Sequence, residues 1–408
     1  MGSCTSVCLQ TSPETGTVVI RDGQGDQSEN VPPSALLQMD LLLPLFERPV
    51  GGVIRSFGVM SAETLRCYLD AFIEKGERDD LCLLLFVGAD VDGLVDGMTA
   101  LQRAIAAQNM EAVRLLVDAG AGLEVEGRLW LKDWPQRYGA YRCSALHLAC
   151  NLNQSEIVVF LLSRGANVNA EMSNKFRPLH IAAARGLKDL IQCLISYGAV
   201  VNAKDRQGVA PLWDAVAHGQ RDTTELLLDR GACVNERQDN GRTPLFFAVG
   251  HREPLFGGLP RVCDHLNVAE LLVSRGADVN AKCNEGGAVL HEAAFVGAED
   301  LVEFFLRAGA DVHATNKCGD TALHSAVLGA VLHRIASLSD LFGPSVSDYA
   351  KKLCVVEMFV SYGINVNAVN HNGVTALAIA ERDFPENLPG ELSLPVCPSS
   401  RMTSSRRL

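Results

Sequence analysis

The 408-residue sequence has few aromatic residues and no long apolar run. Phe, Trp and Tyr make up 6% of the chain, so a core drawn from the 48% of hydrophobic residues has to consist mainly of Leu, Val and Ala. The longest apolar stretch, residues 35–46, is interrupted by Gln38, Asp40 and Pro44. A membrane-spanning helix needs roughly 20 apolar residues. The sequence therefore predicts a globular protein with no transmembrane segment.

Basic charge is also scarce, because 36 Lys and Arg stand against 48 Asp and Glu, for a net charge of −12. Nucleic-acid binding depends on basic side chains that neutralise phosphates, so this balance argues against a nucleic-acid partner and favours a basic protein segment. The 13 cysteines include no C-x-x-C pair, and no secretory signal begins the sequence. These features predict reduced thiols in a cytoplasmic protein.

Two short phrases recur along the chain and keep step with each other. The first is a leucine followed three residues later by an alanine, at Leu101, Leu146, Leu179, Leu212, Leu245, Leu290, Leu323 and Leu377. The second is a glycine that ends an apolar run, at Gly88, Gly120, Gly165, Gly198, Gly231, Gly276, Gly309 and Gly363. Most successive glycines are 32 or 33 residues apart, and the longer spacings are 33 plus 12 or 21. The sequence is therefore a repeat array with insertions.

Each part of the repeat has a physical reason. Thr or Ser before the leucine supplies an N-cap oxygen, and Pro fits the first helical turn. The alanine three residues after the leucine lets a neighbouring helix approach closely. The second run, such as residues 157–162, is apolar on nearly all sides and has to be covered by neighbours, and the glycine after it suits a left-handed helix end. A short extended piece and a polar turn follow, so one unit is predicted to be helix, turn, helix and hairpin.

These phrases resemble the ankyrin-repeat family, whose 33-residue unit carries the signature T-P-L-H-x-A. The resemblance covers residues 61–384 and implies an all-α repeat solenoid with β-hairpin fingers and a concave binding surface. The His of the signature is replaced by Gln102 and Ala378, and the first unit lacks the signature almost entirely. The predicted units lie near 64–95, 96–125, 141–171, 174–203, 207–236, 240–282, 285–315, 318–369 and 372–384. Residues 1–60 are predicted to be largely irregular and residues 385–408 to be a flexible tail.

The residues beyond the 33-residue unit fall in three places. Twelve lie in the finger between the second and third units, twelve between the helices of the sixth unit, and 21 between the helices of the eighth. The first insertion, residues 126–142, contains Trp130, Trp134, Tyr138 and Tyr141 in a chain with three Trp and six Tyr. Aromatic residues dominate interface hot spots, so one interpretation is that this finger binds a partner protein. The other is that it folds back over neighbouring side chains.

Four histidines occupy the signature slot, one per unit: His147, His180, His291 and His324. Their 33-residue period indicates equivalent structural positions with a hydrogen-bonding role, rather than a metal or catalytic site. Trp213 and Phe246 fill the same slot, so the array does not require a titratable group there. The sequence contains no phosphate-binding loop, dinucleotide fingerprint, nucleophile elbow or H-E-x-x-H motif. We therefore predict no catalytic residue, no metal, no cofactor and no enzymatic activity.

The first residues, MGSCTS, match the acyl-acceptor pattern M-G-x-x-x-S/T. Gly2 would carry myristate, which alone holds a membrane only marginally, and Cys4 and Cys8 are placed to carry palmitate as a second anchor. The alternative is a chance match in a terminal segment. A second modification is implied by the ankyrin resemblance, because residues 272–280 resemble the context in which some family members are hydroxylated at Asn. Asn280 would be the acceptor, and its default role is a hairpin hydrogen bond.

The resemblance implies a non-enzymatic scaffold or adaptor that binds another protein on the concave face. One alternative is a membrane-tethered, N-acylated signalling regulator. A less favoured alternative is a substrate receptor of a ubiquitin ligase, which would use a C-terminal SOCS box. Residues 394–398, LPVCP, suit such a box, but no helix that could bind an elongin precedes them. The partner's identity is left open by the sequence.

Overall fold

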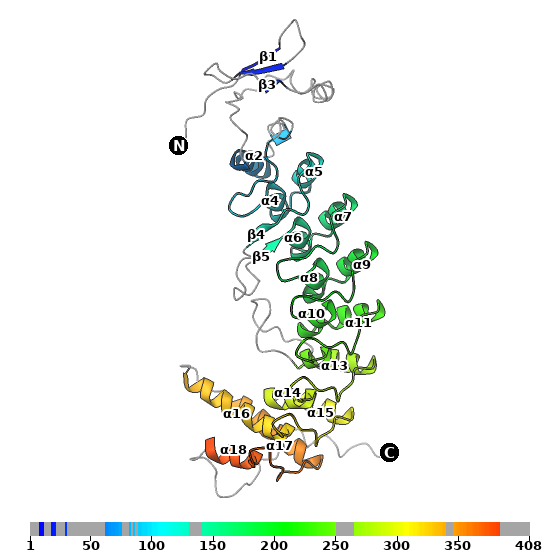
Figure 1. Ribbon diagram of the computed structural model, residues 1–408, viewed down its shortest axis with the longest axis vertical. Coiled ribbons are helices and arrows are strands. Elements are labelled where there is room, and N and C mark those ends of the chain that lie inside the picture. Colours follow the sequence, from blue (N-terminus) through cyan, green and yellow to red (C-terminus); the bar gives the residue numbers. More distant parts are fainter. Residues whose placement is uncertain are drawn as a thin grey trace, which may run out of the picture. The chain divides into compact units, whose positions relative to one another are not determined.

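The computed structural model describes residues 8–11, 18–21, 29–30, 62–75, 81–82, 85, 89–129, 141–249, 265–339 and 346–383 (Figure 1). The chain divides into two compact units. The first comprises residues 1–129 and 142–166, and the second comprises residues 130–141 and 167–408. Helices account for most of the described residues in both units.

The first unit contains α2, α4, α5, α6 and α7. Their bounds are Ala62–Lys75, Ala100–Ala106, Met110–Asp118, Ala145–Asn151 and Ser155–Ser163. Helix α4 packs between α2 and α6, and α5 and α7 pair with α4 and α6. Leu65, Leu69 and Phe72 of α2 are buried, as their helical spacing predicts. The degenerate first unit therefore supplies a helix that covers the end of the stack.

Within residues 1–60, predicted to be largely irregular, the structure describes residues 8–11, 18–21 and 29–30, which form short strands. Strands β1 (Cys8–Thr11), β2 (Val18–Arg21) and β3 (Glu29–Asn30) form an antiparallel sheet in the order β1-β2-β3. Cys8 pairs with Arg21, and Ile20 pairs with both Leu9 and Glu29. The β-branched residues of β2 favour a strand, and this signal is local and independent of the repeat pattern.

The second unit contains the remaining helices: α8 (Pro178–Arg185), α9 (Lys188–Ser196), α10 (Pro211–Ala217), α11 (Arg221–Asp229), α12 (Pro244–Phe247), α13 (His265–Ser274), α14 (Val289–Val296), α15 (Glu299–Arg307), α16 (Ala322–Ser339), α17 (Val346–Ser361) and α18 (Ala376–Asp383). The first helices of successive repeats, α8, α10, α12, α14, α16 and α18, stack in one row. The second helices, α9, α11, α13, α15 and α17, form a second row beside it. The predicted antiparallel helix pairs are therefore confirmed.

Close packing of the first helices rests on the small residues of the repeat. Ala182, Ala215, Ala248 and Ala293 are each 0% exposed, one turn after a buried leucine. One close approach is at Gly329 of α16, where a Cβ atom would lie 2.0 Å from the backbone oxygen of Phe295 in α14. Only glycine fits at that crossing. The second helices end at glycines such as Gly231, whose φ of 86° is the left-handed conformation predicted for this position.

The predicted β-hairpin fingers are tight loops with little strand. The piece expected to be extended, Val168-Asn169, is a turn in which Ala170 N–H donates to the Asn167 oxygen at 3.0 Å. The next loop is closed where Asp205 N–H donates to the Val209 oxygen at 2.9 Å, and the three loops that precede α14, α16 and α18 have one isolated bridge each. Among the described finger loops, paired strands occur in the first insertion, as β4 (Gly127–Leu129) and β5 (Tyr141–Cys143). The short polar segments turn too soon for longer pairing.

The insertion in the eighth repeat lengthens its helices. Helix α16 has 18 residues and α17 has 16, whereas the first helices of the preceding repeats have four to eight. The extra residues were correctly located between the leucine and the glycine, and they continue both helices toward each other. The insertion of the sixth repeat, residues 250–264, lies outside the described residues.

Candidate protein-binding surface

The signature histidines bridge backbone groups at both ring nitrogens. Nδ1 of His291 accepts the Ala288 N–H at 3.1 Å, at the start of its own helix. Nε2 of the same ring lies 3.2 Å from the Asp320 oxygen, in the loop that leads to the next repeat. Because a backbone N–H can only donate to Nδ1, the ring proton is on Nε2 and the histidine is neutral. His180 and His324 make the same pair of contacts, so the predicted structural role of these rings is confirmed at three positions.

Gln102 performs the same task in the second repeat, where the sequence departs from the signature. Its Oε1 accepts the Thr99 N–H at 3.1 Å, and its Nε2 donates to the Cys143 oxygen at 2.7 Å. An amide thus replaces both ring nitrogens without a titratable group. Burial lowers the pKa of His291, and the charge of Lys282 lowers it further, against the effect of the Asp320 hydrogen bond. This slot is built for neutral donors and acceptors.

Four asparagines of the second unit connect a repeat to the repeat that follows it. Nδ2 of Asn280 donates to the Gly309 oxygen at 3.1 Å, and its Oδ1 accepts the Asp311 N–H at 2.8 Å. The equivalent residues Asn169, Asn202 and Asn235 make the same two bonds to the following repeat. The expected hairpin bond of Asn280 is therefore a bond between repeats. Asn280 is exposed, and its hydroxylation stays a prediction.

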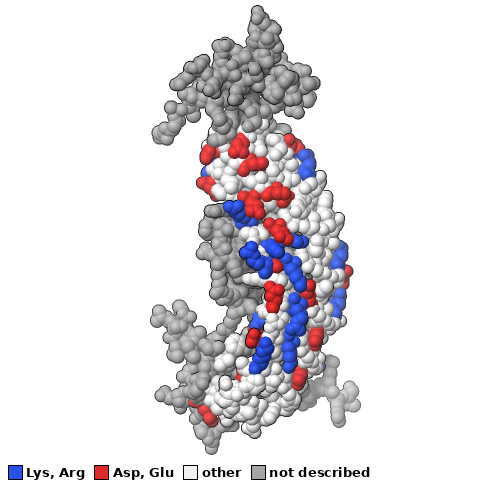
Figure 2. All heavy atoms as spheres, viewed as in Figure 1, with Lys and Arg blue, Asp and Glu red and all other residues white. Residues whose placement is uncertain are grey.

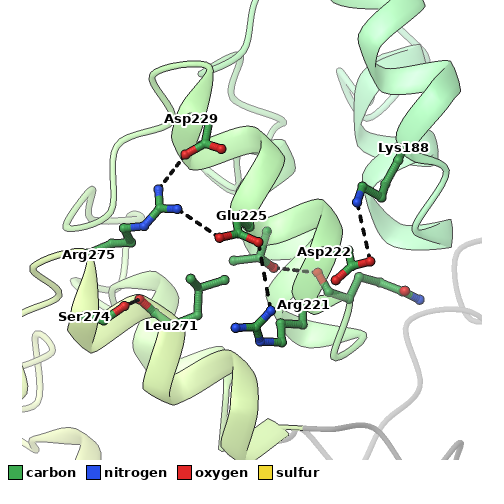
Figure 3. Close-up of polar contacts among 10 residues, drawn as sticks. Lys188, Arg221, Asp222, Glu225, Asp229, Leu271, Ser274 and Arg275 are labelled. Carbon is green, nitrogen blue, oxygen red and sulfur yellow. Dashed lines mark hydrogen bonds and ion pairs between the residues drawn. The ribbon is translucent and has the colours of Figure 1, made fainter.

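The second helices carry their charges in ion pairs that cross from repeat to repeat (Figure 3). Lys188 of α9 lies 3.4 Å from Asp222 of α11. Arg275, at the end of α13, reaches Asp229 at 2.7 Å and Glu225 at 3.1 Å, both on α11. These pairs are exposed, so each contributes little to stability. They join side chains of opposite charge on successive second helices.

Asp214 is the functional-looking residue that the sequence analysis missed. It lies on α10, is 2% exposed, and follows the buried Trp213 of the signature slot. The equivalent positions of the neighbouring repeats hold the buried apolar residues Ile181 and Phe247. Its Oδ2 has no hydrogen-bond partner in the described part of the chain, and neither has Trp213 Nε1. Burial raises the pKa of Asp214 well above its usual value, and the charge of Asp205 adds to the shift. The sequence feature that could have identified this residue is a carboxylate at a repeat position that is apolar in the neighbouring repeats.

The residues predicted to bind a partner or a lipid lie almost wholly outside the described residues. Trp130, Trp134 and Tyr138 are not described, and neither are Gly2 and Cys4. Tyr141 begins β5, and Cys8 begins β1, with only the backbone described in both cases. Their proposed roles stay predictions.

The described residues form neither a metal centre nor a membrane-spanning helix. Within them, no group of three His, Cys, Asp or Glu side chains is arranged to hold a metal ion. The signature histidines face successive loops rather than one another. No helix in the same part of the chain combines the length and the apolar composition needed to cross a membrane.

Comparison with known families agrees with this geometry. A profile of three ankyrin repeats matches residues 71–172, 146–238, 179–283 and 259–338. The matches span more than half of the 408 residues, and the chain therefore belongs to the ankyrin-repeat family. Members of this family are generally non-enzymatic scaffolds, and their repeats are protein–protein interaction modules.

Two individual proteins illustrate the similarity. The potassium channel AKT2/3 of Arabidopsis thaliana is 32% identical over 107 residues, which cover 24% of this chain and 13% of the channel. The chain thus matches only a small part of that relative's length. Among solved structures, the ankyrin repeat domain of Bcl-3, a unique member of the IkappaB protein family, is 28% identical with a TM-score of 0.44. That match covers 56% of this chain and 94% of the Bcl-3 chain.

Proposed function

We propose that this protein is a non-enzymatic scaffold or adaptor that binds another protein through its finger loops and first helices. The observation that carries the proposal is that the polar side chains of the repeat signature form hydrogen bonds within the array. The histidines, Gln102 and the asparagines are engaged inside and between repeats, and several charges of the second helices pair with one another. The side chains of the finger loops and of the exposed parts of the first helices are not required for these contacts, so this surface can differ between proteins and recognise a partner. Affinity on such a surface comes from a few anchors in a larger contact area.

The aromatic finger, residues 126–142, is the first anchor to test. The double variant Trp130→Ala and Trp134→Ala is expected to lose the partners that the intact chain captures in affinity purification with mass spectrometry. The matched control is Tyr197→Ala with Tyr362→Ala, which removes two exposed aromatic side chains that follow second helices. Partner capture should survive in the control, and the melting temperature should change little in either variant. A large stability loss in the Trp variant with capture retained would mean that the finger covers its neighbours.

The N-terminal acylation pattern supports a second candidate, a membrane-tethered signalling regulator. In this proposal Gly2 carries myristate and Cys4 or Cys8 carries palmitate, because one chain alone anchors weakly. Gly2→Ala should move the protein from the membrane fraction to the soluble fraction of cells, and Ser3→Ala should not. Unchanged membrane recovery of the Gly2 variant would exclude this candidate.

The ubiquitin-ligase receptor is the third and least supported candidate. It rests on the segment 394–398 alone, which lies outside the described residues. Copurification of elongins and a cullin with the full chain would support it, and their loss on deletion of residues 385–408 would locate the contact.

A further inference from the structure

The residue after the signature slot is charged in three of the described first helices: Arg103 of α4, Asp214 of α10 and Glu292 of α14. Arg103 lies 3.3 Å from Asp70, and Glu292 lies 3.1 Å from Arg242. Each of these partners belongs to the preceding repeat. The array therefore supplies counter-ions for the charged residues at this position in α4 and α14.

Asp214 is the exception in this series. Among the described residues it forms no ion pair, and its Oδ2 accepts no hydrogen bond. Arg242 stands three residues before the signature leucine of its own repeat, and in the repeat before Asp214 that position is occupied by Phe176, which is buried. The position that provides a cation for Glu292 thus holds an apolar ring in the repeat before Asp214.

The surroundings of Asp214 favour the approach of a cation. Ile181 of α8 and Phe247 of α12, at the equivalent positions of the helices that pack against α10, are both buried and apolar, so they cannot neutralise the carboxylate. Burial raises the pKa of Asp214, and the charge of Asp205 in the loop before α10 raises it further. A positive charge beside the carboxylate would counter both effects.

The equivalent position meets solvent elsewhere in the array, since the side chains of Glu292 and Arg242 are 27% and 24% exposed. Asp214 itself is 2% exposed, so a ligand reaches its carboxylate only after a local shift of neighbouring side chains. Lys and Arg suit such a position, because their charged group is carried at the end of a long apolar stem. The ligand chemistry that fits is therefore a basic side chain.

Surface charge as a whole does not select a partner for this protein. Figure 2 shows basic and acidic side chains mixed on the viewed face, so recognition on that face depends on individual contacts. The net charge of −12 gives a basic segment only a general preference. A buried carboxylate without a counter-ion is a specific contact, because one cation at one place stabilises it.

We propose that Asp214 is the counter-ion for a lysine or arginine side chain of the partner protein, which approaches α10 from the side of the finger loops. This inference rests on the proposed function and adds the chemistry of one anchor. The partner's cation has the role that Arg242 has for Glu292, and its apolar stem contacts Ile181 and Phe247. A carboxylate that weakens the free chain and is neutralised on binding fits the trade-off between stability and function that binding residues show.

The test is a selection from a displayed library of random 15-residue peptides, run in parallel on the full-length wild type and on Asp214→Asn. Enriched peptides are then synthesised and titrated by fluorescence anisotropy. Asp300→Asn is the matched control, because it removes the same charge from an exposed position on α15. Asp214→Leu replaces the Asn variant if that variant does not fold by circular dichroism.

The expected result is that the wild type enriches peptides that share a Lys or Arg and that the Asp214 variant does not. Replacing the shared basic residue of a peptide with Met should weaken its binding to the wild type about tenfold or more. The same replacement should have a much smaller effect on binding to Asp214→Asn, because the two changes remove one interaction. Asp300→Asn should bind every peptide as the wild type does.

Peptides without a shared basic residue, no enrichment at all, or equal losses in Asp214→Asn and Asp300→Asn would overturn the inference. A loss of stability in Asp214→Leu would also overturn it, because the chain itself would then supply the partner of this carboxylate. The proposed function is distinguished by capture of cellular partners. Capture that depends on Trp130 and Trp134 but not on Asp214 would show that the chain is a scaffold and that only the role of Asp214 was wrong.

Discussion

At the scale of the residue, Asp214 is a carboxylate in a buried, largely apolar environment. An ionised carboxylate without a hydrogen-bond partner for Oδ2 is costly in an apolar position, so the carboxyl has a raised pKa. A group whose pKa is raised by folding binds protons more readily in the native state. Its contribution to stability is therefore greatest below the unfolded pKa of 3.8 and is lost as the pH rises through the native pKa. At neutral pH Asp214 weakens the fold.

Replacing this carboxylate with an apolar side chain should stabilise the protein. Asp214→Leu resembles the neighbouring Ile181 and Phe247, and we expect the free energy of unfolding at pH 7 to rise by about 1–3 kcal/mol. Urea denaturation across a pH series provides the measurement, and the gain should shrink toward pH 4. Asp239→Leu, at an exposed position, is the control and should change stability by less than about 0.5 kcal/mol. A loss of stability in the Asp214 variant would show that the carboxylate has a stabilising partner.

At the scale of the element, the helix starts depend on a bridging side chain that need not titrate. His291→Gln should keep both hydrogen bonds, because Gln102 makes the equivalent bonds in its own repeat. We expect the Gln variant to lie within about 1 kcal/mol of the wild type at pH 8, and His291→Ala to lose about 1–3 kcal/mol.

The pH dependence of the same variants provides the sharper distinction. Folding lowers the pKa of His291, so its contribution is fully present above the unfolded value of 6.5 and is lost as the pH falls through the native pKa. The Gln variant should therefore lose less stability than the wild type between pH 7 and pH 5, measured by chemical denaturation. Equal losses in the two proteins would show that protonation of this ring does not destabilise the fold.

The asparagine bridges between repeats allow a second test at this scale. Asn280→Ala removes both bonds to the following repeat, and we expect a loss of about 1–2 kcal/mol. Asn280→Asp keeps an acceptor for the Asp311 N–H but cannot donate to the Gly309 oxygen, so its loss should be smaller. Thermal denaturation ranks the variants. Identical melting temperatures for the wild type and the two variants would show that the bridge does not stabilise the fold. The mass of residue 280 in protein purified from cells tests its hydroxylation separately.

At the scale of the whole molecule, the cysteines report opening of the fold. The nine cysteines whose side chains are described are unbridged thiols. Cys67, Cys233 and Cys318 are exposed, whereas Cys143 and Cys150 are buried. Burial, with a smaller effect of Glu126, raises the pKa of Cys143 to about 12, so its thiolate is scarce at neutral pH.

Thiol labelling followed by peptide mass spectrometry should therefore divide these residues into two classes. The three exposed cysteines should react with a maleimide at the rate of a small-molecule thiol. Cys143 and Cys150 should react only as the first unit opens, and faster as urea is added. Rapid labelling of Cys143 in the native protein would contradict the packing around β5 and α6.

Much of the fold could be predicted, because the signals are local. The leucine–alanine phrase located α8, α14 and α16, and its last occurrence, at Leu377, lies in α18. The role of Gln102 could not be read from the sequence, since an amide in a histidine slot looks like a defect until its contact with Cys143 is known. The length of α16 was missed for a similar reason, because an insertion between two helices can form a loop or extend the helices.

The sequence by itself determined that the chain is an array of helix pairs, because cap, alanine and closing glycine act within one repeat. The tertiary structure alone decided which polar groups form hydrogen bonds with neighbouring repeats and which remain exposed. His291 meets Asp320, and Asn280 meets Gly309, only because adjacent repeats stack.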